Sequence, residues 1–351
     1  MINKGLYRFK DRLGKIPWPS FFLPVLFLGI GWAESPQPGA EESGRMVDRA
    51  LPGHSPKGGA TEKTTLVDAR GRIVALDKPA NRIVSLLPSL TEFLFELDQG
   101  HRLVGRTNWC RHPPETQSIA VVGGLENPVA ESILALTPDI ILAGPFLREE
   151  QVNHLESLNL KVATFDHHNW ATIVRDLSWL GKIIDREDEV IKLIHGMDQR
   201  RRSIETRGRG KPIRTLLLYS LEPLYSCGAD TFIHELIELA GGQNIAADSE
   251  SPWPMLSLET VLANQPEVLL VSSNGARQEE FFKRFQRLPR DPIWGQMDAV
   301  RNNRIYLLDG DTLAVAGPRL VSALDQIAAA LQPEIFDAPA ELIHLDLKDE
   351  K

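Results

Sequence analysis

Two stretches of this chain read almost alike, although they lie 128 positions apart. Residues 131–142 read Glu-Ser-Ile-Leu-Ala-Leu-Thr-Pro-Asp-Ile-Ile-Leu, and residues 259–270 read Glu-Thr-Val-Leu-Ala-Asn-Gln-Pro-Glu-Val-Leu-Leu. In each, a short amphipathic segment ends at a proline, and an acidic residue and an apolar run typical of a buried strand follow. A helix-to-strand unit that recurs half a chain later predicts two similar α/β lobes. Two such lobes can close on a small molecule from opposite sides.

The first 33 residues have the pattern of a secretory signal peptide. Basic residues precede an apolar run from Phe21 to Trp32, which is shorter than the roughly 20 residues that span a bilayer. Small residues at Gly31 and Ala33 predict cleavage after Ala33 and export to the periplasm. An uncleaved anchor that reaches back to Ile16 is the alternative. The absence of a cysteine near the site argues against a lipid anchor.

Composition and periodicity divide the remaining chain. Residues 34–64 are rich in Pro, Gly, Ser and Ala, which predicts a disordered linker. Strands alternate with helices afterwards, so we expect two Rossmann-like α/β lobes with central, mainly parallel sheets and a ligand cleft between them. The expected parts are an N-terminal lobe over residues 65–169, a connecting helix over 170–207, a C-terminal lobe over 208–336 and a tail over 337–351.

Two local patterns predict helices in these lobes. Ser89-Leu-Thr-Glu92 has the form of a capping box that opens a helix. Residues 170–207 carry one unbroken helical pattern of apolar residues without proline, and a helix of that length would run about 55 Å. Such a helix would brace both lobes, which predicts small opening motions.

Composition excludes several classes of function. The formal net charge of −8 argues against nucleic acid or anionic lipid as a partner. The sequence has no phosphate-binding loop, no nucleophile elbow and no His-Glu-x-x-His motif, so we expect no enzyme. Its histidines lack the spacing of metal ligands, so we expect no resident metal or cofactor.

The two cysteines, Cys110 and Cys227, fall in different expected lobes. A bridge between them would lock the cleft, which favours free thiols, with a disulfide as the alternative in an oxidising compartment.

A dispersed set of motifs between Arg82 and Leu331 resembles one known family. Besides the repeated segments, the motifs are Arg82-Ile-Val-Ser-Leu-Leu-Pro-Ser-Leu-Thr-Glu92, Leu103-Val-Gly-Arg-Thr-Asn-Trp-Cys-Arg-His-Pro-Pro114, Val122-Gly-Gly, Cys227-Gly228, Gly241-Gly-Gln-Asn244, Ser251-Pro-Trp-Pro254 and Gly317-Pro-Arg319. They resemble the helical-backbone (class III) solute-binding proteins that deliver metal chelates to ABC importers, and among these the vitamin B12 (cobalamin) receptors most closely. The resemblance implies a monomeric receptor that binds a cobalt corrinoid between its lobes and delivers it to an ABC importer permease dimer.

Carried over position by position, the resemblance implies ligand contacts at Trp109, Trp253, Tyr219, Tyr225 and Asp311. A corrinoid is a wide, mostly apolar disc fringed with amides, which suits flat aromatic faces and a few polar groups. Trp109 precedes Arg111-His-Pro-Pro, and Trp253 stands between two prolines, so both indoles are expected on rigid turns. Simple packing is the alternative for each, and packing is what we expect of Trp179 on the long helix.

Other positions near the expected pocket leave the identity of the chelate open. Leu125 stands where the family has an aromatic residue, and Val315 where it has a rim arginine. Cys110, His112 and Cys227 lie beside the expected pocket, where a thiol or imidazole could approach a metal, or where small side chains simply line the cleft.

The repeated glutamates, Glu131 and Glu259, match the family's docking pair, which the resemblance places against arginines of the two transporter subunits. The helix dipole also favours Glu at a helix start, but it does not explain equivalent positions in both lobes. An iron-siderophore or haem receptor of the same fold is the alternative function. A nitrogenase-like oxidoreductase is the alternative from another class, although its clusters need several cysteines.

Overall fold

The computed structural model describes residues 63–208, 210–273 and 278–347. The predicted signal peptide and nearly all of the predicted linker lie outside these residues. The first lobe starts with an antiparallel hairpin, β1 (Thr64–Val67) and β2 (Ile73–Leu76). A five-stranded parallel sheet follows in the order β5-β4-β3-β6-β7. Its strands are β3 (Ile83–Ser85), β4 (Leu103–Arg106), β5 (Ala120–Val121), β6 (Ile140–Ala143) and β7 (Val162–Thr164).

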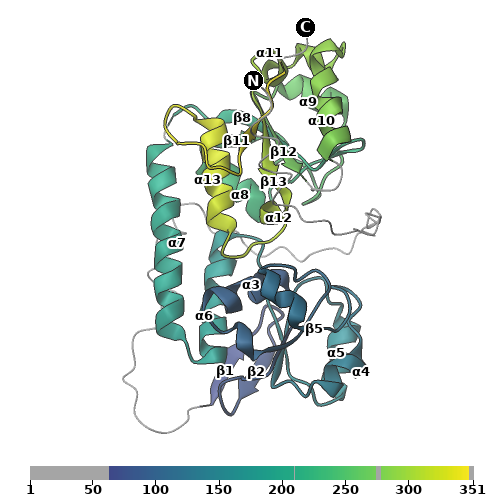
Figure 1. The fold of residues 1–351 in the computed structure, drawn as a ribbon, viewed down its shortest axis with the longest axis vertical. Coiled ribbons are helices and arrows are strands. Elements are labelled where there is room, and N and C mark those ends of the chain that lie inside the picture. Colours follow the sequence, from purple (N-terminus) through teal and green to yellow (C-terminus); the bar gives the residue numbers. More distant parts are fainter. Residues whose placement is uncertain (1–62, 209, 274–277, 348–351) are drawn as a thin grey trace. The chain divides into compact units, whose positions relative to one another are not determined.

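Helices cover both faces of this sheet (Figure 1). They are α3 (Pro88–Glu96), α4 (Ala130–Ala135), α5 (Glu149–Ser157) and α6 (Trp170–Ile184), with short 3-10 turns η1 (Gly100–Arg102) and η2 (Pro114–Ser118). Buried β6 residues alternate between the faces: Ile140 and Leu142 share a core with α3 and α6, whereas Ile141 and Ala143 share one with α4 and α5. This period of two is why a continuous apolar run predicts a strand covered on both sides.

The second lobe repeats this plan with the sheet order β11-β8-β12-β13-β14, in which only the β13–β14 pair is antiparallel. Its strands are β8 (Ile213–Leu218), β11 (Gly242–Asn244), β12 (Val268–Ser273), β13 (Ile305–Asp309) and β14 (Ile343–His344), and a small hairpin is formed by β9 (Ser220–Leu221) and β10 (Leu224–Tyr225). The helices are α8 (Phe232–Leu239), α9 (Leu258–Asn264), α10 (Gln278–Arg287), α11 (Asp298–Arg301), α12 (Gly310–Leu313) and α13 (Leu320–Leu331), with 3-10 turns η4 (Leu288–Arg290) and η5 (Trp294–Gln296). The predicted two-lobe α/β fold is confirmed.

The sequence repeat is also a repeat of backbone geometry. Thr137 follows α4 and Gln265 follows α9, and both residues have positive φ, 45° and 41°. Arg82, just before β3, donates from Nε to the carbonyls of Leu136 and Thr137. Arg214, in β8, makes the equivalent bonds to the carbonyls of Asn264 and Gln265. In each lobe, an arginine at the start of the first strand of the five-stranded sheet therefore donates hydrogen bonds to the last carbonyls of the repeated helix.

The long connecting helix is present, but it is shorter than predicted. The structure divides residues 170–207 into α6 and α7 (Glu187–Arg207), which is 21 residues long. Asp185 ends α6 in the left-handed conformation, with φ of 54°. The two helices pack closely because Gly181 has no side chain, and a Cβ there would lie 3.2 Å from Val190 Cγ2. The prediction of a single helix over the whole range is therefore wrong in extent, and α7 runs about 31 Å.

Two further expectations need correction. The Ser89 to Glu92 motif is not a capping box, because Leu87 is the N-cap of α3 and makes no side-chain cap bond. Pro88 opens the helix instead, which leaves the Ser89 hydroxyl to bond Nδ1 of His167 (2.8 Å). The predicted tail contains β14, which pairs with β13 in the second sheet. Among the described residues, no helix combines the length and apolar character needed to cross a membrane.

Candidate functional site

The predicted ligand residues follow the carboxyl ends of the parallel strands. Trp109 comes after β4 in the first lobe, while Tyr219 follows β8 and Asp311 follows β13 in the second. Open α/β sheets bind ligands in the crevice outside these strand ends, near the point where the strand order reverses. The sheet topology therefore puts the predicted residues of each lobe at the edge where a ligand is expected.

Trp109 lies on a turn and is 43% exposed, so it does not belong to the core. Its backbone N–H donates to Oγ1 of Thr107 (3.3 Å), and the Arg111 guanidinium lies 5.0 Å from the centre of its ring. The neighbouring amide of Asn108 donates to the carbonyl of Gly123 (3.0 Å), which ties the turn to the loop that carries half-buried Leu125. The indole of Trp109 is therefore exposed, while backbone hydrogen bonds of Trp109 and Asn108 fix the turn that carries it.

Trp253 in the second lobe is 41% exposed and packs edge-on against Tyr219, with ring centres 5.6 Å apart at 71°. The carbonyls of the flanking residues Pro252 and Pro254 accept hydrogen bonds from the amides of Gly228 and Ser226. Both neighbours of the tryptophan are thus fixed to the protein while its ring stays accessible. Gly228 is required there, because a Cβ would lie 2.4 Å from the Ser251 carbonyl oxygen.

The two predicted tyrosines form the frame behind Trp253. The Tyr219 amide donates to the Tyr225 carbonyl (2.9 Å), and Tyr225 bridges to Met255. The Tyr219 hydroxyl is buried without a hydrogen-bond partner among the described residues. Burial raises the pKa of this phenol well above its ordinary value, and the thiol of Cys227 adds to the rise. Tyr219 therefore stays neutral and gives the site an aromatic, uncharged wall.

Asp311 brings a polar group to the site from α12. Desolvation by the surrounding protein raises the pKa of its carboxyl, and the neighbouring charge of Asp309 raises it further. Arg319, Arg111 and His112 act on this pKa in the opposite direction. Arg111 and His112 belong to the Trp109 turn, so Asp311 lies within electrostatic range of the first lobe's part of the site.

The cysteines do not line this site. Cys110 is 1% exposed and Cys227 is 0% exposed, and both are free. The thiol of Cys110 lies 3.3 Å from Oγ1 of Thr107, while Cys227 belongs to the continuous hydrophobic core. The prediction that their side chains contact the ligand is therefore wrong, because both are small apolar groups that fill the interior. The described residues also contain no group of three or more His, Cys, Asp or Glu side chains placed to hold a metal.

One aromatic residue of this edge was not predicted. Phe146 follows β6 after Gly144 and Pro145, and it is 46% exposed. Because β6 is parallel to β3 and β4, its carboxyl end lies at the same edge as the Trp109 turn. The signal in the sequence was an aromatic residue directly after a Gly-Pro turn at a strand end.

The repeated glutamates occupy equivalent places. Glu131 lies in the first turn of α4 and Glu259 in the first turn of α9, and both are exposed. The hydroxyl of Ser257 caps α9, and hydrogen bonds to the Glu259 backbone and to Ser257 lower the pKa of the Glu259 carboxyl. Each lobe therefore displays one acidic side chain at the start of its repeated helix.

A fold of two lobes with mainly parallel sheets, each with an exposed indole on a turn beside the site residues of its lobe, is that of a two-lobe solute-binding protein. The sequence matches the periplasmic binding protein family over residues 83–312, and the chain belongs to that family. Its architecture is that of the helical-backbone (class III) members.

Individual relatives agree with this assignment. The vitamin B12-binding protein of Vibrio cholerae is 27% identical over 262 residues, which cover 74% of this chain and 92% of that protein. YvrC of Bacillus subtilis, an uncharacterized ABC transporter substrate-binding lipoprotein, is 25% identical over 281 residues, which cover 78% and 86%.

Two solved structures have a similar fold. The periplasmic vitamin B12 binding protein BtuF of Vibrio cholerae matches with a TM-score of 0.63 and 27% identity, covering 73% of this chain and 98% of that one. The periplasmic heme-binding protein RhuT of Roseiflexus sp. RS-1 matches with a TM-score of 0.63 and 26% identity, covering 72% and 98%. These two structures, one named for binding vitamin B12 and the other for binding heme, are about equally similar to this chain.

Proposed function

We propose that this chain is an exported, periplasmic receptor that captures a corrinoid, cobalamin or a close relative, and delivers it to an ABC importer. The observation that carries the proposal is the pair of half-exposed indoles, Trp109 and Trp253, one in each lobe and each fixed on a backbone turn. Large rings on turns cover wide apolar ligand surface without much loss of side-chain freedom on binding.

The character of the surrounding groups supports a flat, mostly neutral ligand. Tyr219 is neutral, and Phe146 adds a further exposed ring at the same strand edge. Asp311 supplies a polar group that suits the amides at the rim of a corrin. The named B12-binding relatives agree with this choice of ligand class. We propose no enzymatic activity and no resident cofactor for the chain; the corrinoid is its cargo.

Haem is the second candidate, and a specific observation favours it. The Trp109 turn carries Arg111 and His112, both exposed. A guanidinium can pair with a propionate, and an imidazole can ligate haem iron. A haem-binding relative of comparable similarity keeps this candidate open to test.

Titration of tryptophan fluorescence tests the proposal. Purified protein is titrated with cyanocobalamin, dicyanocobinamide, hemin and a ferric siderophore, and a corrinoid is expected to bind most tightly. Replacing Trp109 or Trp253 with alanine should weaken corrinoid binding roughly tenfold or more, about 1.4 kcal/mol, because each indole loses its stacking area. Trp179→Phe is the matched control, because Trp179 packs against the core beside Phe165, with ring centres 6.2 Å apart. Tighter binding of hemin than of either corrinoid would replace the proposal with the second candidate.

A further inference from the structure

We propose that Arg319 is a positioning residue, which holds the Asp311 loop of the second lobe against the first lobe through its ion pair with Glu92. This role deepens the receptor function proposed above and rests on it, because Asp311 contributes to binding only if the chain is such a receptor. The contacts that Arg319 makes do not depend on that function.

The ion pair joins elements that are 227 residues apart. Nε of Arg319 donates to Oε2 of Glu92 (2.9 Å), and Nη2 donates to Oε1 (2.6 Å). Glu92 lies on α3 and is 4% exposed, whereas Arg319 is the N-cap of α13. A carboxylate that is buried in the first lobe is therefore neutralised by a two-pronged guanidinium from the second. Removing either partner leaves a desolvated charge without compensation.

The guanidinium of Arg319 also contacts the Asp311 loop, which contains the short helix α12. Nη1 of Arg319 donates to Oγ1 of Thr312 (3.3 Å), and Nη2 lies 3.4 Å from the carbonyl oxygen of Asp311. Asp309 holds the other side of this short helix by accepting from the Asp311 amide (3.0 Å) and from the Thr312 hydroxyl (2.7 Å). Arg319 thus connects one side chain of the first lobe to the backbone that carries Asp311.

Close approach around the pair leaves little freedom for movement. A Cβ at Gly317 would lie 3.0 Å from Oε2 of Glu92, so the segment before Arg319 runs directly against the carboxylate. A second polar contact links the lobes through their junction, because Glu235 on α8 accepts from the backbone N–H of Trp170 at the start of α6 (2.6 Å). The pair is therefore one of the points where a polar side chain fixes one lobe to the other.

The test measures the separation of the lobes without any ligand. Ala135 and Ala263 are exposed, lie on α4 and α9, and are equivalent positions of the sequence repeat. Spin labels on Ala135→Cys and Ala263→Cys report the interlobe distance by pulsed electron resonance, and the buried native cysteines stay unlabelled. Wild type should give one narrow distribution. Glu92→Gln and Arg319→Gln should each at least double its width, and the double variant should add nothing more, because both changes remove one interaction.

Control variants separate this role from general stability. Arg70→Gln breaks the ion pair with Glu149 on α5, inside the first lobe and on a helix without a label, and should leave the distribution unchanged. Arg319→Lys keeps the charge but loses the two-pronged geometry, so it should give an intermediate width. If Arg319→Gln does not fold, the width of the distance distribution in Arg319→Lys tests the proposal instead. Distributions of folded Glu92→Gln and Arg319→Lys that superimpose on wild type would overturn the proposal.

Cyanocobalamin titration of the same proteins separates the two proposals. Folded variants with a widened distribution should bind it roughly tenfold more weakly than wild type, because the preorganised loop is lost. If wild type binds no corrinoid yet the variants widen, the receptor function fails while the positioning role stands. If wild type binds and the variants match it in affinity and width, the positioning role fails while the function stands.

Discussion

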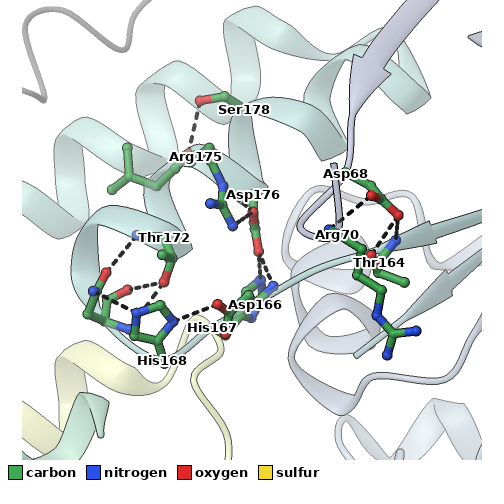
Figure 2. Close-up of polar contacts among 12 residues, drawn as sticks. Asp68, Arg70, Thr164, Asp166, His167, His168, Thr172, Arg175, Asp176 and Ser178 are labelled. Carbon is green, nitrogen blue, oxygen red and sulfur yellow. Dashed lines mark hydrogen bonds and ion pairs between the residues drawn. The ribbon is translucent and has the colours of Figure 1, made fainter. Parts of the chain in front are cut away.

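Nε2 of His167 lies 3.4 Å from Oδ2 of Asp176, and both side chains are buried. Figure 2 shows Asp176 between Arg175 and the segment that carries Asp166 and His167. Nε of Arg175 donates to one oxygen of this carboxyl (2.8 Å), and the backbone N–H of Asp166 donates to the other (2.7 Å). Burial lowers the pKa of His167 to about 4 and raises the pKa of Asp176 to about 7. His167 lies between β7 and α6, and Asp176 lies on α6, so the pair joins the end of the first sheet to the first connecting helix.

These opposite pKa changes predict opposite pH dependences for two variants. Between pH 4 and 6.5 the unfolded chain binds a proton at His167 that the folded chain excludes, so His167 destabilises the fold as the pH falls. Between pH 4 and 7 the folded chain retains a proton on Asp176 that the unfolded chain releases, so Asp176 destabilises the fold as the pH rises. Relative to wild type, the free energy of unfolding of His167→Gln should therefore increase toward acid, and that of Asp176→Asn should increase toward neutrality.

Each slope should approach about 1.4 kcal/mol per pH unit. Urea unfolding at several pH values across the window measures both differences against wild type. Slopes of the same sign in the two variants would contradict the assignment.

The repeated glutamates lead to a prediction about transport. Replacing Glu131 and Glu259 together with alanine should leave corrinoid affinity unchanged, because both side chains are exposed in the first turn of a repeated helix and neither belongs to the turns that hold the two indoles. Uptake by cells in which this chain is the only receptor should fall by roughly tenfold or more, because surface charges steer and orient docking.

The control for transport is Glu150→Ala with Glu250→Ala, which removes one exposed acidic side chain from each lobe outside the repeated helices. These changes should not affect uptake. Equal loss in both double variants would indicate a general effect of net charge, and lost ligand affinity in the first would exclude a docking role.

The cysteines should be unreactive in the folded protein. Burial raises the pKa of Cys227 to about 12 and raises the pKa of Cys110, so neither forms the nucleophilic thiolate. A thiol-reactive chromogenic disulfide should find no free thiol in the native chain and two after unfolding without reductant. Rapid reaction of the native protein would contradict this prediction, because it would mean that a cysteine is accessible. If no thiol reacts after unfolding, the two cysteines form a disulfide.

Two glycines should respond oppositely to alanine. Gly241 has a φ of 85°, and a Cβ there would lie 2.6 Å from Nε2 of Gln332. That amide bonds the carbonyls of Gly208 and Ala240, so Gly241→Ala should cost about 2 kcal/mol or more. Gly196 lies within α7 with nothing within 4 Å, so Gly196→Ala should stabilise by about 0.5 to 1 kcal/mol. Urea unfolding compares the two, and a neutral Gly241→Ala would show that the loop adapts.

The fold was predictable where local patterns carry it. The repeated segments have strong apolar periods, and both give the helix and strand that their sequences predict. The break at Asp185 was not predictable from periodicity. Ile184 and Val190 face the same core from two helices, so the apolar pattern continues through the turn. Neither glycine nor proline marks that turn.

The site was predictable only in part. The Pro113-Pro114 pair a few residues after Trp109 and the two prolines that flank Trp253 indicate turns, and both indoles are accessible. The burial of Cys227 and the contact between Glu92 and Arg319 depend on segments far apart in the sequence, and no local pattern contains that information. Gly317-Pro-Arg319 was recognisable as a motif, but its partner on α3 was not.

Equilibrium dialysis with cyanocobalamin tests the central claim most directly. Protein dialysed against excess cyanocobalamin and then against buffer should retain one equivalent of corrinoid, visible in its absorbance spectrum. The Trp109→Ala, Trp253→Ala double variant should retain far less. Retention of no corrinoid by the wild-type protein, or equal retention by the double variant, would contradict the account.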